Sequence, residues 1–378
     1  MPVSSQSRPE ERTAPKRKRV PPRFVVHVTL RLRRFLLGVA DRFLPAQIAL
    51  LEHAHSFTVV HLLAAFAELG VADHLADGPK TAKELAGLVQ SDADALHRAL
   101  RAAAVVGIVR LDAAGKFHAT RLTTPLRSHD PSATADWCRY IGSPSLQGAW
   151  SDLTQTLRTG ESAFRRVNGM DTFRWFDTHP DEGRRFTAGL GGLTRAEAAM
   201  ILAAYPFPNN GILCDVAGGA GILLGEILRA RPGLRGILVE APLVLTDAGA
   251  YLDSIGLASR VQLVQGDLFV AFQATADIYL LKWVLHDWDD QTCKVILKNI
   301  ATAMPKGARL VVIEGDQAQN QVHARFSPLD IQMLTALEGG RERSGEEIAH
   351  LLADSGLRRR RVRHTATDLV LVEATVQS

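Results

Sequence analysis

Several features that mark common protein classes are scarce or absent in this sequence of 378 residues. It has three isolated cysteines, Cys138, Cys214 and Cys293, and no C-x-x-C pair or Cys/His spacing typical of a metal site. No run of eighteen uncharged apolar residues occurs, so we expect no membrane-spanning helix and no membrane partner. The isolated thiols suit a reducing compartment, so we expect a cytoplasmic protein without a bound metal.

Acidic residues are scarce at the start of the chain, where residues 1–45 hold 11 basic and 3 acidic side chains. The rest of the chain has 33 basic and 37 acidic side chains, a balance that argues against a nucleic-acid partner. We expect residues 1–45 to form a solvated, poorly ordered tail. An organelle transit peptide and a weak membrane-surface helix are the alternatives for this Arg-rich segment.

The region that follows is expected to be mainly helical. Residues 46–76 place apolar residues at mixed spacings of three and four, which predicts a helix with more than one buried face that needs a partner. Thr81 and Glu84 form a capping-box pattern, and a second helix runs to Gly107 before a predicted β-hairpin.

Helix, helix and hairpin in this order resemble a winged-helix unit. A DNA-binding regulator is therefore one hypothesis. However, the second helix offers only His97, Arg98 and Arg101 to a nucleic acid, which favours a scaffold or dimerisation role.

Aromatic residues make up only 6% of the chain, yet many of them lie in residues 134–207. Ordinary helix packing explains most of them. A subset that includes Trp137 is a candidate lining for a pocket that accepts an aromatic ligand.

From residue 211 onward, strands and helices alternate, which predicts a parallel sheet with helices on both faces. Ligands bind such sheets at the carboxyl ends of the strands. Residues 356–376 read as an antiparallel strand pair around a Thr-Asp turn. The expected domains are the tail at 1–45, a helical domain at 46–207 and a catalytic α/β domain at 208–378.

The first strand of the α/β domain runs into the loop LCDVAGGAG, residues 213–221, which lacks parts of two common phosphate loops. Gly219 and Gly221 begin a G-x-G-x-x-G pattern, but Leu224 replaces the third glycine and no G-K-[ST] follows. The dehydrogenase and P-loop interpretations are therefore weak. The run fits Asp215 followed by a loop that lets a ligand approach the backbone without a pyrophosphate to bind.

Two further acidic residues end neighbouring strands. Glu240 is placed where a carboxylate accepts ribose hydroxyls. Asp267 is placed to accept from an adenine amino group while Leu268 contacts the ring. Any one of these acids alone is more often a helix cap or a surface carboxylate.

Two more motifs complete the pattern: LKWVLHDWDD at 281–290 and GGRERS at 339–344. With them, the chain resembles the S-adenosylmethionine-dependent small-molecule O-methyltransferases, which include plant caffeic acid and flavonoid enzymes and bacterial antibiotic-tailoring enzymes. The resemblance implies a Rossmann-like methyltransferase domain, S-adenosylmethionine as cofactor, an aromatic small-molecule acceptor, and a homodimer with exchanged N-terminal helices.

The resemblance also implies roles for individual residues. His286 is similar to the family's general base, with Glu314 and Glu342 flanking it, and Met333 falls in the acceptor pocket. The implied cofactor contacts are Thr194, Asp215, Gly219, Gly221, Glu240, Asp267, Leu268 and Lys282. Ala217 departs from the family pattern, because it replaces the first glycine of the loop and an alanine fits there only with a negative φ.

The histidine has a suitable pKa to take a proton from a phenol, and a carboxylate on its other nitrogen would fix its tautomer. Glu314 and Glu342 are both candidates for that carboxylate. Asp287, Asp289 and Asp290 are expected to cap and charge the next helix. Alternatives within the same fold are N-methylation and cofactor-assisted hydroxylation or decarboxylation.

Overall fold

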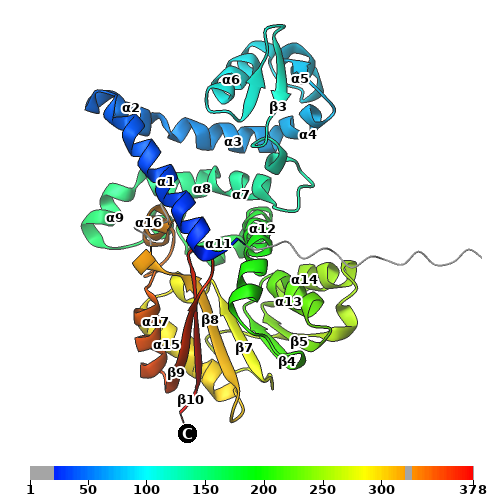
Figure 1. The fold of residues 1–378 in the computed structure, drawn as a ribbon, viewed down its shortest axis with the longest axis vertical. Coiled ribbons are helices and arrows are strands. Elements are labelled where there is room, and N and C mark those ends of the chain that lie inside the picture. Colours follow the sequence, from blue (N-terminus) through cyan, green and yellow to red (C-terminus); the bar gives the residue numbers. More distant parts are fainter. Residues whose placement is uncertain (1–20, 320–325, 378) are drawn as a thin grey trace, which may run out of the picture.

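The computed structural model describes residues 21–319 and 326–377, with helices in the N-terminal half and a large sheet in the C-terminal half (Figure 1). The N-terminal elements are α1 (Arg23–Arg42), α2 (Ala46–His55), α3 (Phe57–Leu69), α4 (Val71–Ala76), β1 (Lys80–Thr81), α5 (Ala82–Leu88), α6 (Ala93–Val105), β2 (Val109–Leu111), β3 (Lys116–Ala119), α7 (Thr134–Ile141), α8 (Pro144–Ser151), α9 (Leu153–Thr159), α10 (Ala163–Asn168), α11 (Thr172–Thr178) and α12 (Pro180–Ala204).

A seven-stranded sheet forms the C-terminal half, in the order β6-β5-β4-β7-β8-β10-β9. Its elements are β4 (Asn210–Val216), α13 (Ile222–Ala230), β5 (Gly233–Glu240), α14 (Pro242–Ser254), β6 (Val261–Gln265), β7 (Ile278–Lys282), α15 (Asp290–Ala303), β8 (Arg309–Gly315), α16 (Phe326–Ala336), α17 (Gly345–Asp354), β9 (Leu357–His364) and β10 (Leu369–Val376). Strands β4 to β8 pair in parallel, and β10 pairs antiparallel with β8 and β9. The predicted α/β fold with its C-terminal antiparallel pair is confirmed.

Helices cover both faces of this sheet (Figure 1). One core cluster joins α12, α13 and α14 to the sheet, and the other joins α15 and α17 to the opposite face. The central strands are therefore buried on both sides, which explains why they read as continuous apolar runs rather than as alternating patterns.

The predicted order of helix, helix and hairpin is present near the N-terminus. Thr81 and Glu84 form a complete capping box at the start of α5, and Asp92 caps α6. Leu96 and Leu100 of α6 pack in one core with Phe117 of β3. Strands β2 and β3 form the hairpin, and β1 adds to it as a third strand.

Helix α12 connects the helical half to the sheet, and small residues let it approach α7 closely. A Cβ at Gly192 would collide with the Ser132 carbonyl, and one at Gly189 would lie 2.9 Å from the Trp137 ring. This close packing brings the aromatic residues of the helical half against the helix that also carries Thr194.

The expectation of a poorly ordered tail is wrong for part of the segment. Residues 23–42 form helix α1, while residues 1–20 lie outside the described residues. The reason is the spacing of Phe24, Val28, Leu32 and Phe35, which places four large apolar side chains on one helical face. The arginines between them led to the assignment as a solvated tail.

The predicted helix at 46–76 is divided into α2, α3 and α4, and no residue of α2 is buried. Within the part of the chain that the structure describes, one stretch, Ala46–Leu69, is long and apolar enough to cross a membrane. The stretch meets this length and hydropathy criterion although Glu52 and Glu68 interrupt it, so it contains no run of eighteen uncharged apolar residues.

Candidate active site

His286 lies just beyond the carboxyl end of β7, on a short 3-10 turn, Leu285–Asp287. Its Nδ1 is 2.8 Å from Oε1 of Glu342, and its Nε2 is 3.3 Å from Oδ1 of Asp287. All three side chains are largely buried, so both ring nitrogens face carboxylates in a region with little water. The hydrogen bond to Glu342 fixes the orientation of the ring.

The two candidate partners of the histidine have different roles. Glu314, at the end of β8, accepts hydrogen bonds from the backbone N–H groups of Val284 at 3.0 Å and Leu285 at 2.8 Å. It therefore holds the turn that carries His286, while Glu342 contacts the ring itself. The sequence left open which of the two glutamates lies against the histidine ring. In the structure it is Glu342.

The GGRERS loop supports the same turn from the other side. The backbone N–H of Arg341 donates to the His286 carbonyl at 2.8 Å. The buried guanidinium of Arg343 donates to the carbonyls of Leu285 at 2.5 Å and Trp288 at 2.8 Å. Sequence analysis missed Arg343, although its position inside the motif was a usable signal.

The carboxylates around His286 alter its pKa. Burial alone lowers it, but the charge of Asp287, the hydrogen bond to Glu342 and the charge of Glu314 outweigh burial and raise the pKa to about 9. Burial raises the pKa of Asp287 to about 6 and that of Glu314 to about 7, although the charge of His286 opposes both shifts. The surrounding carboxylates therefore favour the imidazolium form of His286.

The assignment of Asp287 as a helix cap is wrong. Asp289 is the N-cap of α15 and accepts from the Thr292 N–H at 2.7 Å, and Asp290 pairs with Arg343 at 2.7 Å. Asp287 instead lies inside the turn, against His286. The sequence places three aspartates before α15 but does not show which of their side chains is buried against the turn.

Three acids lie at the carboxyl ends of neighbouring strands: Asp215 within β4, Glu240 as the last residue of β5, and Asp267 two residues after β6. Asp215 is buried, and its Oδ2 has no hydrogen-bond partner. Burial raises its pKa to about 7, an effect that Lys282 opposes and Glu240 increases. Glu240 accepts from the N–H groups of Gly219 at 2.9 Å and Ala241 at 2.8 Å. Asp267 is exposed and accepts from the Phe269 N–H at 2.8 Å.

The glycine loop after β4 is tightly turned. Gly219 and Gly221 have φ of +57° and +73°, and a Cβ at Gly218 would lie 2.5 Å from Oδ2 of Asp215. Ala217 has φ of +53°, so the negative φ that an alanine requires is not found. The left-handed conformation strains any residue with a Cβ.

The structure brings Thr194 and Lys282, two of the implied cofactor contacts, together. The Lys282 ammonium donates to Oγ1 of Thr194 at 3.0 Å and lies 3.1 Å from Oε2 of Glu197. Glu197, three residues after Thr194 on α12, was missed by sequence analysis. Leu268 follows Asp267 in the loop after β6, where its carbonyl accepts from the Asn299 side chain at 2.9 Å.

Aromatic side chains form one cluster that includes both predicted pocket residues. Trp137 packs on Tyr140 with ring centroids 5.5 Å apart, and Met333 of α16 is buried in the same cluster. Trp288, two residues after His286, stacks on Phe173 at 5.4 Å. The cluster therefore reaches the turn that carries His286.

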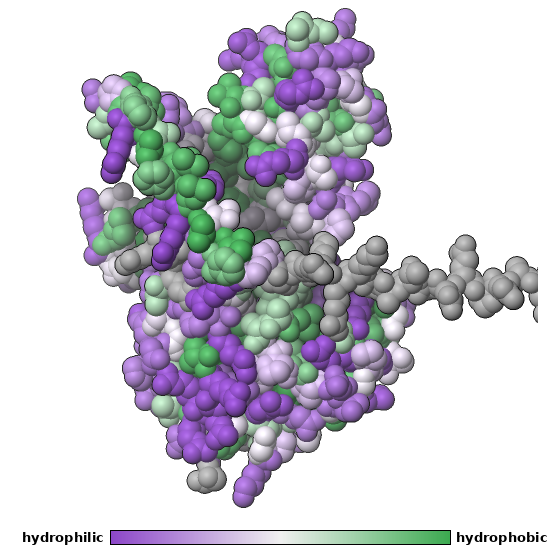
Figure 2. All heavy atoms as spheres, viewed as in Figure 1, coloured by the Kyte–Doolittle hydropathy of each residue, from purple (hydrophilic) through white to green (hydrophobic). Residues whose placement is uncertain are grey.

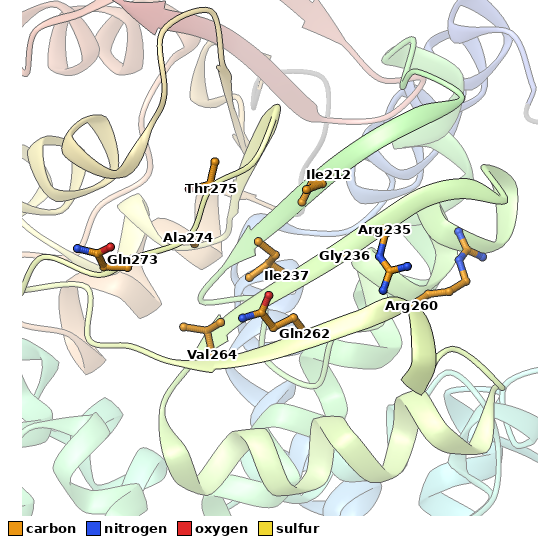
Figure 3. Close-up of a pocket in the computed structure, with 10 residues that line it drawn as sticks. All are labelled: Ile212, Arg235, Gly236, Ile237, Arg260, Gln262, Val264, Gln273, Ala274 and Thr275. Atoms are coloured by element: carbon orange, nitrogen blue, oxygen red, sulfur yellow. The ribbon is translucent and has the colours of Figure 1, made fainter.

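A separate groove of about 340 Å³ lies over strands β4 to β6 (Figure 3). Its lining includes Arg235 and Arg260. The Arg260 guanidinium already donates hydrogen bonds to the carbonyls of Leu228, Arg231 and Leu234. None of the predicted site residues lines it. In the described ranges, 21–319 and 326–377, no group of three or more His, Cys, Asp or Glu residues is arranged to hold a metal.

Comparison with known proteins decides the family. Residues 150–358 match the model of the O-methyltransferase domain, and residues 51–126 match the O-methyltransferase dimerisation domain. The chain belongs to the O-methyltransferase family. Like the named enzymes it resembles, this protein is an S-adenosylmethionine-dependent O-methyltransferase of the group active in secondary metabolism.

The relatives of this O-methyltransferase include bacterial antibiotic-tailoring enzymes. A phenazine O-methyltransferase of Lysobacter antibioticus is 36% identical over 330 residues, which cover 87% of this chain and 96% of the relative. The mitomycin biosynthesis 6-O-methyltransferase of Streptomyces lavendulae is 40% identical over 296 residues, covering 77% and 83%. An 8-amino-8-demethylriboflavin N,N-dimethyltransferase of Streptomyces davaonensis is 32% identical, covering 79% and 86%.

A solved relative supplies the link to the cofactor. The O-methyltransferase of neocarzinostatin biosynthesis, in complex with S-adenosylmethionine and 2-hydroxy-5-methyl naphthoic acid, aligns with a TM-score of 0.72 and 30% identity over 84% of this chain and 96% of that chain. In this chain, Oδ2 of Asp215 has no hydrogen-bond partner, and Gly218 has no Cβ to fill the space beside it. Both features fit a ligand held close to the backbone. Asp215, Glu240 and Asp267 are the residues that would hold it.

Proposed function

We propose that this enzyme methylates a hydroxyl of an aromatic small molecule, with His286 as general base. The observation that carries the proposal is the buried contact of 2.8 Å between Nδ1 of His286 and Glu342. This contact engages Nδ1, so the nitrogen that would receive the proton is Nε2, which lies 3.3 Å from Oδ1 of Asp287. Trp288 places an aromatic surface two residues away. The aromatic cluster around Trp137 and Met333 supports an aromatic acceptor.

The protein's own groups have distinct tasks in this reaction. When bound, S-adenosylmethionine would supply an electrophilic methyl group and would leave as S-adenosylhomocysteine. The aromatic cluster holds the acceptor ring so that its oxygen is in line for attack, which supplies much of the rate enhancement. Nε2 of His286 takes the hydroxyl proton, which moves from oxygen to nitrogen as the oxygen–carbon bond forms. Glu342 stabilises the resulting imidazolium.

The pKa of His286 sets a requirement on this step. A base must be neutral to accept a proton, whereas Asp287 and Glu342 favour the charged ring. The acceptor hydroxyl must therefore approach Nε2 in the fraction of molecules that carry a neutral imidazole. The rate of the free enzyme is expected to rise with pH.

We also propose a homodimer in the cytoplasm, without nucleic acid as a partner. The match of residues 51–126 to a dimerisation domain supports the dimer. In a single chain, no residue of α2 is buried and only Phe66 and Ala67 of α3 are. The winged-helix interpretation and a DNA-binding regulator have no support beyond the order of their elements. The reducing environment suggested by three free thiols supports the location.

N-methylation is a second candidate, because one relative is named as an N,N-dimethyltransferase. An amine acceptor needs a base only to remove the proton of the ammonium product, after methyl transfer. A histidine oriented by Glu342 therefore favours a hydroxyl acceptor over an amine acceptor. Hydroxylation and decarboxylation have no specific observation in their favour.

The proposal is tested by titrating S-adenosylmethionine into the protein and then measuring methyl transfer to a panel of phenols and matched aromatic amines. We expect micromolar binding and transfer to phenols that rises with pH. Transfer only to the amines would establish the second candidate. Binding without transfer to any phenol or amine would refute both.

A further inference from the structure

Helix α1 has an apolar face that the rest of the chain does not cover. Phe24, Val28, Leu32, Phe35 and Leu36 are between 53% and 70% exposed. Their spacing places them within one arc of the helix. Figure 2 shows apolar side chains gathered along this helix on the visible face of the molecule.

Neither α2 nor the rest of the described chain buries the apolar face of α1. No residue of α1 or α2 is buried, although a few side chains of α1 such as Val26 and Leu30 are partly covered. A monomeric soluble protein seldom leaves so continuous an apolar surface in water. Both family matches begin after residue 42, so the family's dimerisation domain does not include α1 either.

The polar residues of α1 are almost all basic. Arg31 and Arg33 are exposed and lie on opposite flanks of the apolar face, at about 100° of rotation per residue, and Arg34 lies on the back. The only acidic residue of α1 is Asp41, in its last turn. An apolar face between arginines is the arrangement of a helix that lies in the plane of a membrane surface, with its cations at the headgroups.

We propose that α1 docks on an anionic lipid surface, with its apolar face at the acyl boundary and Arg31 and Arg33 among the lipid phosphates. Charge complementarity favours this occupant over a second copy of the chain. A symmetric contact between two α1 helices would bring their arginines together, with only Asp41 to offset them. Docking would hold the enzyme where apolar acceptors dissolve, and it does not depend on which acceptor is methylated.

The test is co-sedimentation of the full chain with vesicles of phosphatidylcholine containing phosphatidylglycerol, and with vesicles of phosphatidylcholine alone. We expect binding to the anionic vesicles that weakens as salt is added, and little binding to the neutral ones. The double variant Leu32→Gln/Phe35→Gln is expected to bind roughly tenfold or more weakly, since two side chains no longer enter the lipid.

The matched control is Thr29→Gln/Gly38→Gln, which places the same polar groups away from the centre of the apolar face. A Cβ at Gly38 meets nothing within 4 Å, so this variant is expected to fold and to keep vesicle binding. Thermal melting checks that both variants fold, and light scattering gives their oligomeric state. Absence of anionic-vesicle binding, or equal loss in both variants, overturns the proposal. Conversion of the Leu32/Phe35 variant alone to monomers overturns it in favour of a second copy as the occupant.

Discussion

Replacing Glu342 with glutamine should change how the reaction depends on pH. Glutamine has nearly the same shape and can still accept a hydrogen bond from Nδ1 of His286, but it removes a buried negative charge 2.8 Å from that atom. With less negative charge nearby, the pKa of His286 should fall from about 9 toward the ordinary imidazole value of about 6.5. The direction follows because an anion stabilises the protonated ring.

The size of the effect follows from the same values. With a pKa of about 9, roughly 1% of the imidazole is neutral at pH 7, and the rate of the free enzyme should rise about tenfold per pH unit until about pH 9. A fall of one to two units in Glu342→Gln would raise the neutral fraction at pH 7 about tenfold or more. The plateau rate should nevertheless drop, since the variant stabilises the imidazolium less well.

The assay is kcat/KM for methyl transfer from about pH 6 to about pH 10, which reports groups in the free enzyme. Glu338→Gln is the matched control, because it removes the same charge at the surface, where Glu338 pairs with Arg165. We expect the midpoint to move to lower pH in Glu342→Gln alone. A wild-type profile without a rise toward about pH 9, or an unchanged midpoint in Glu342→Gln, would refute the reasoning.

Three further changes test other parts of the structure. Ala217→Gly should relieve about 1–2 kcal/mol of strain in the left-handed backbone, while the greater freedom of the unfolded chain should cost about 0.4–1 kcal/mol. The melting temperature should therefore rise by one to a few degrees. A lower melting temperature would contradict the presence of strain at Ala217. Glu197→Gln should destabilise the fold by about 3 kcal/mol, because it leaves Lys282 buried without its anion. Adding Lys282→Met should restore most of that loss in denaturant unfolding, and no restoration would argue against the ion pair. Ser344→Ala removes the N-cap of α17 and should cost about 1 kcal/mol in the same assay, whereas no loss would mean the cap is dispensable.

Features carried by local patterns were predictable from the sequence. The parallel strands are runs of apolar residues that end at or next to Asp215, Glu240 or the turn to His286, and the capping box of Thr81 and Glu84 follows a simple spacing. Such patterns depend on neighbours within a few residues. They therefore locate most of the fold and the edge of the sheet that carries the site.

Features decided by distant packing were not predictable. Which glutamate reaches His286 depends on how the loop with Glu342, 56 residues later, folds back on the turn. The inward direction of Asp287 depends on the same turn, and the φ of Ala217 depends on the path of the loop between β4 and α13. Helix α1 was misassigned because its arginines obscured a spacing that only the helical geometry makes clear.

The central claim is that His286 removes the acceptor proton. Its most direct test is a single-turnover measurement of methyl transfer from labelled S-adenosylmethionine to a phenolic acceptor, comparing the wild type with His286→Asn at saturating cofactor. We predict a rate lower by about 10² to 10⁴ with unchanged affinity for S-adenosylhomocysteine. A His286→Asn rate equal to that of the wild type would contradict the claim and leave positioning of the acceptor as the source of catalysis.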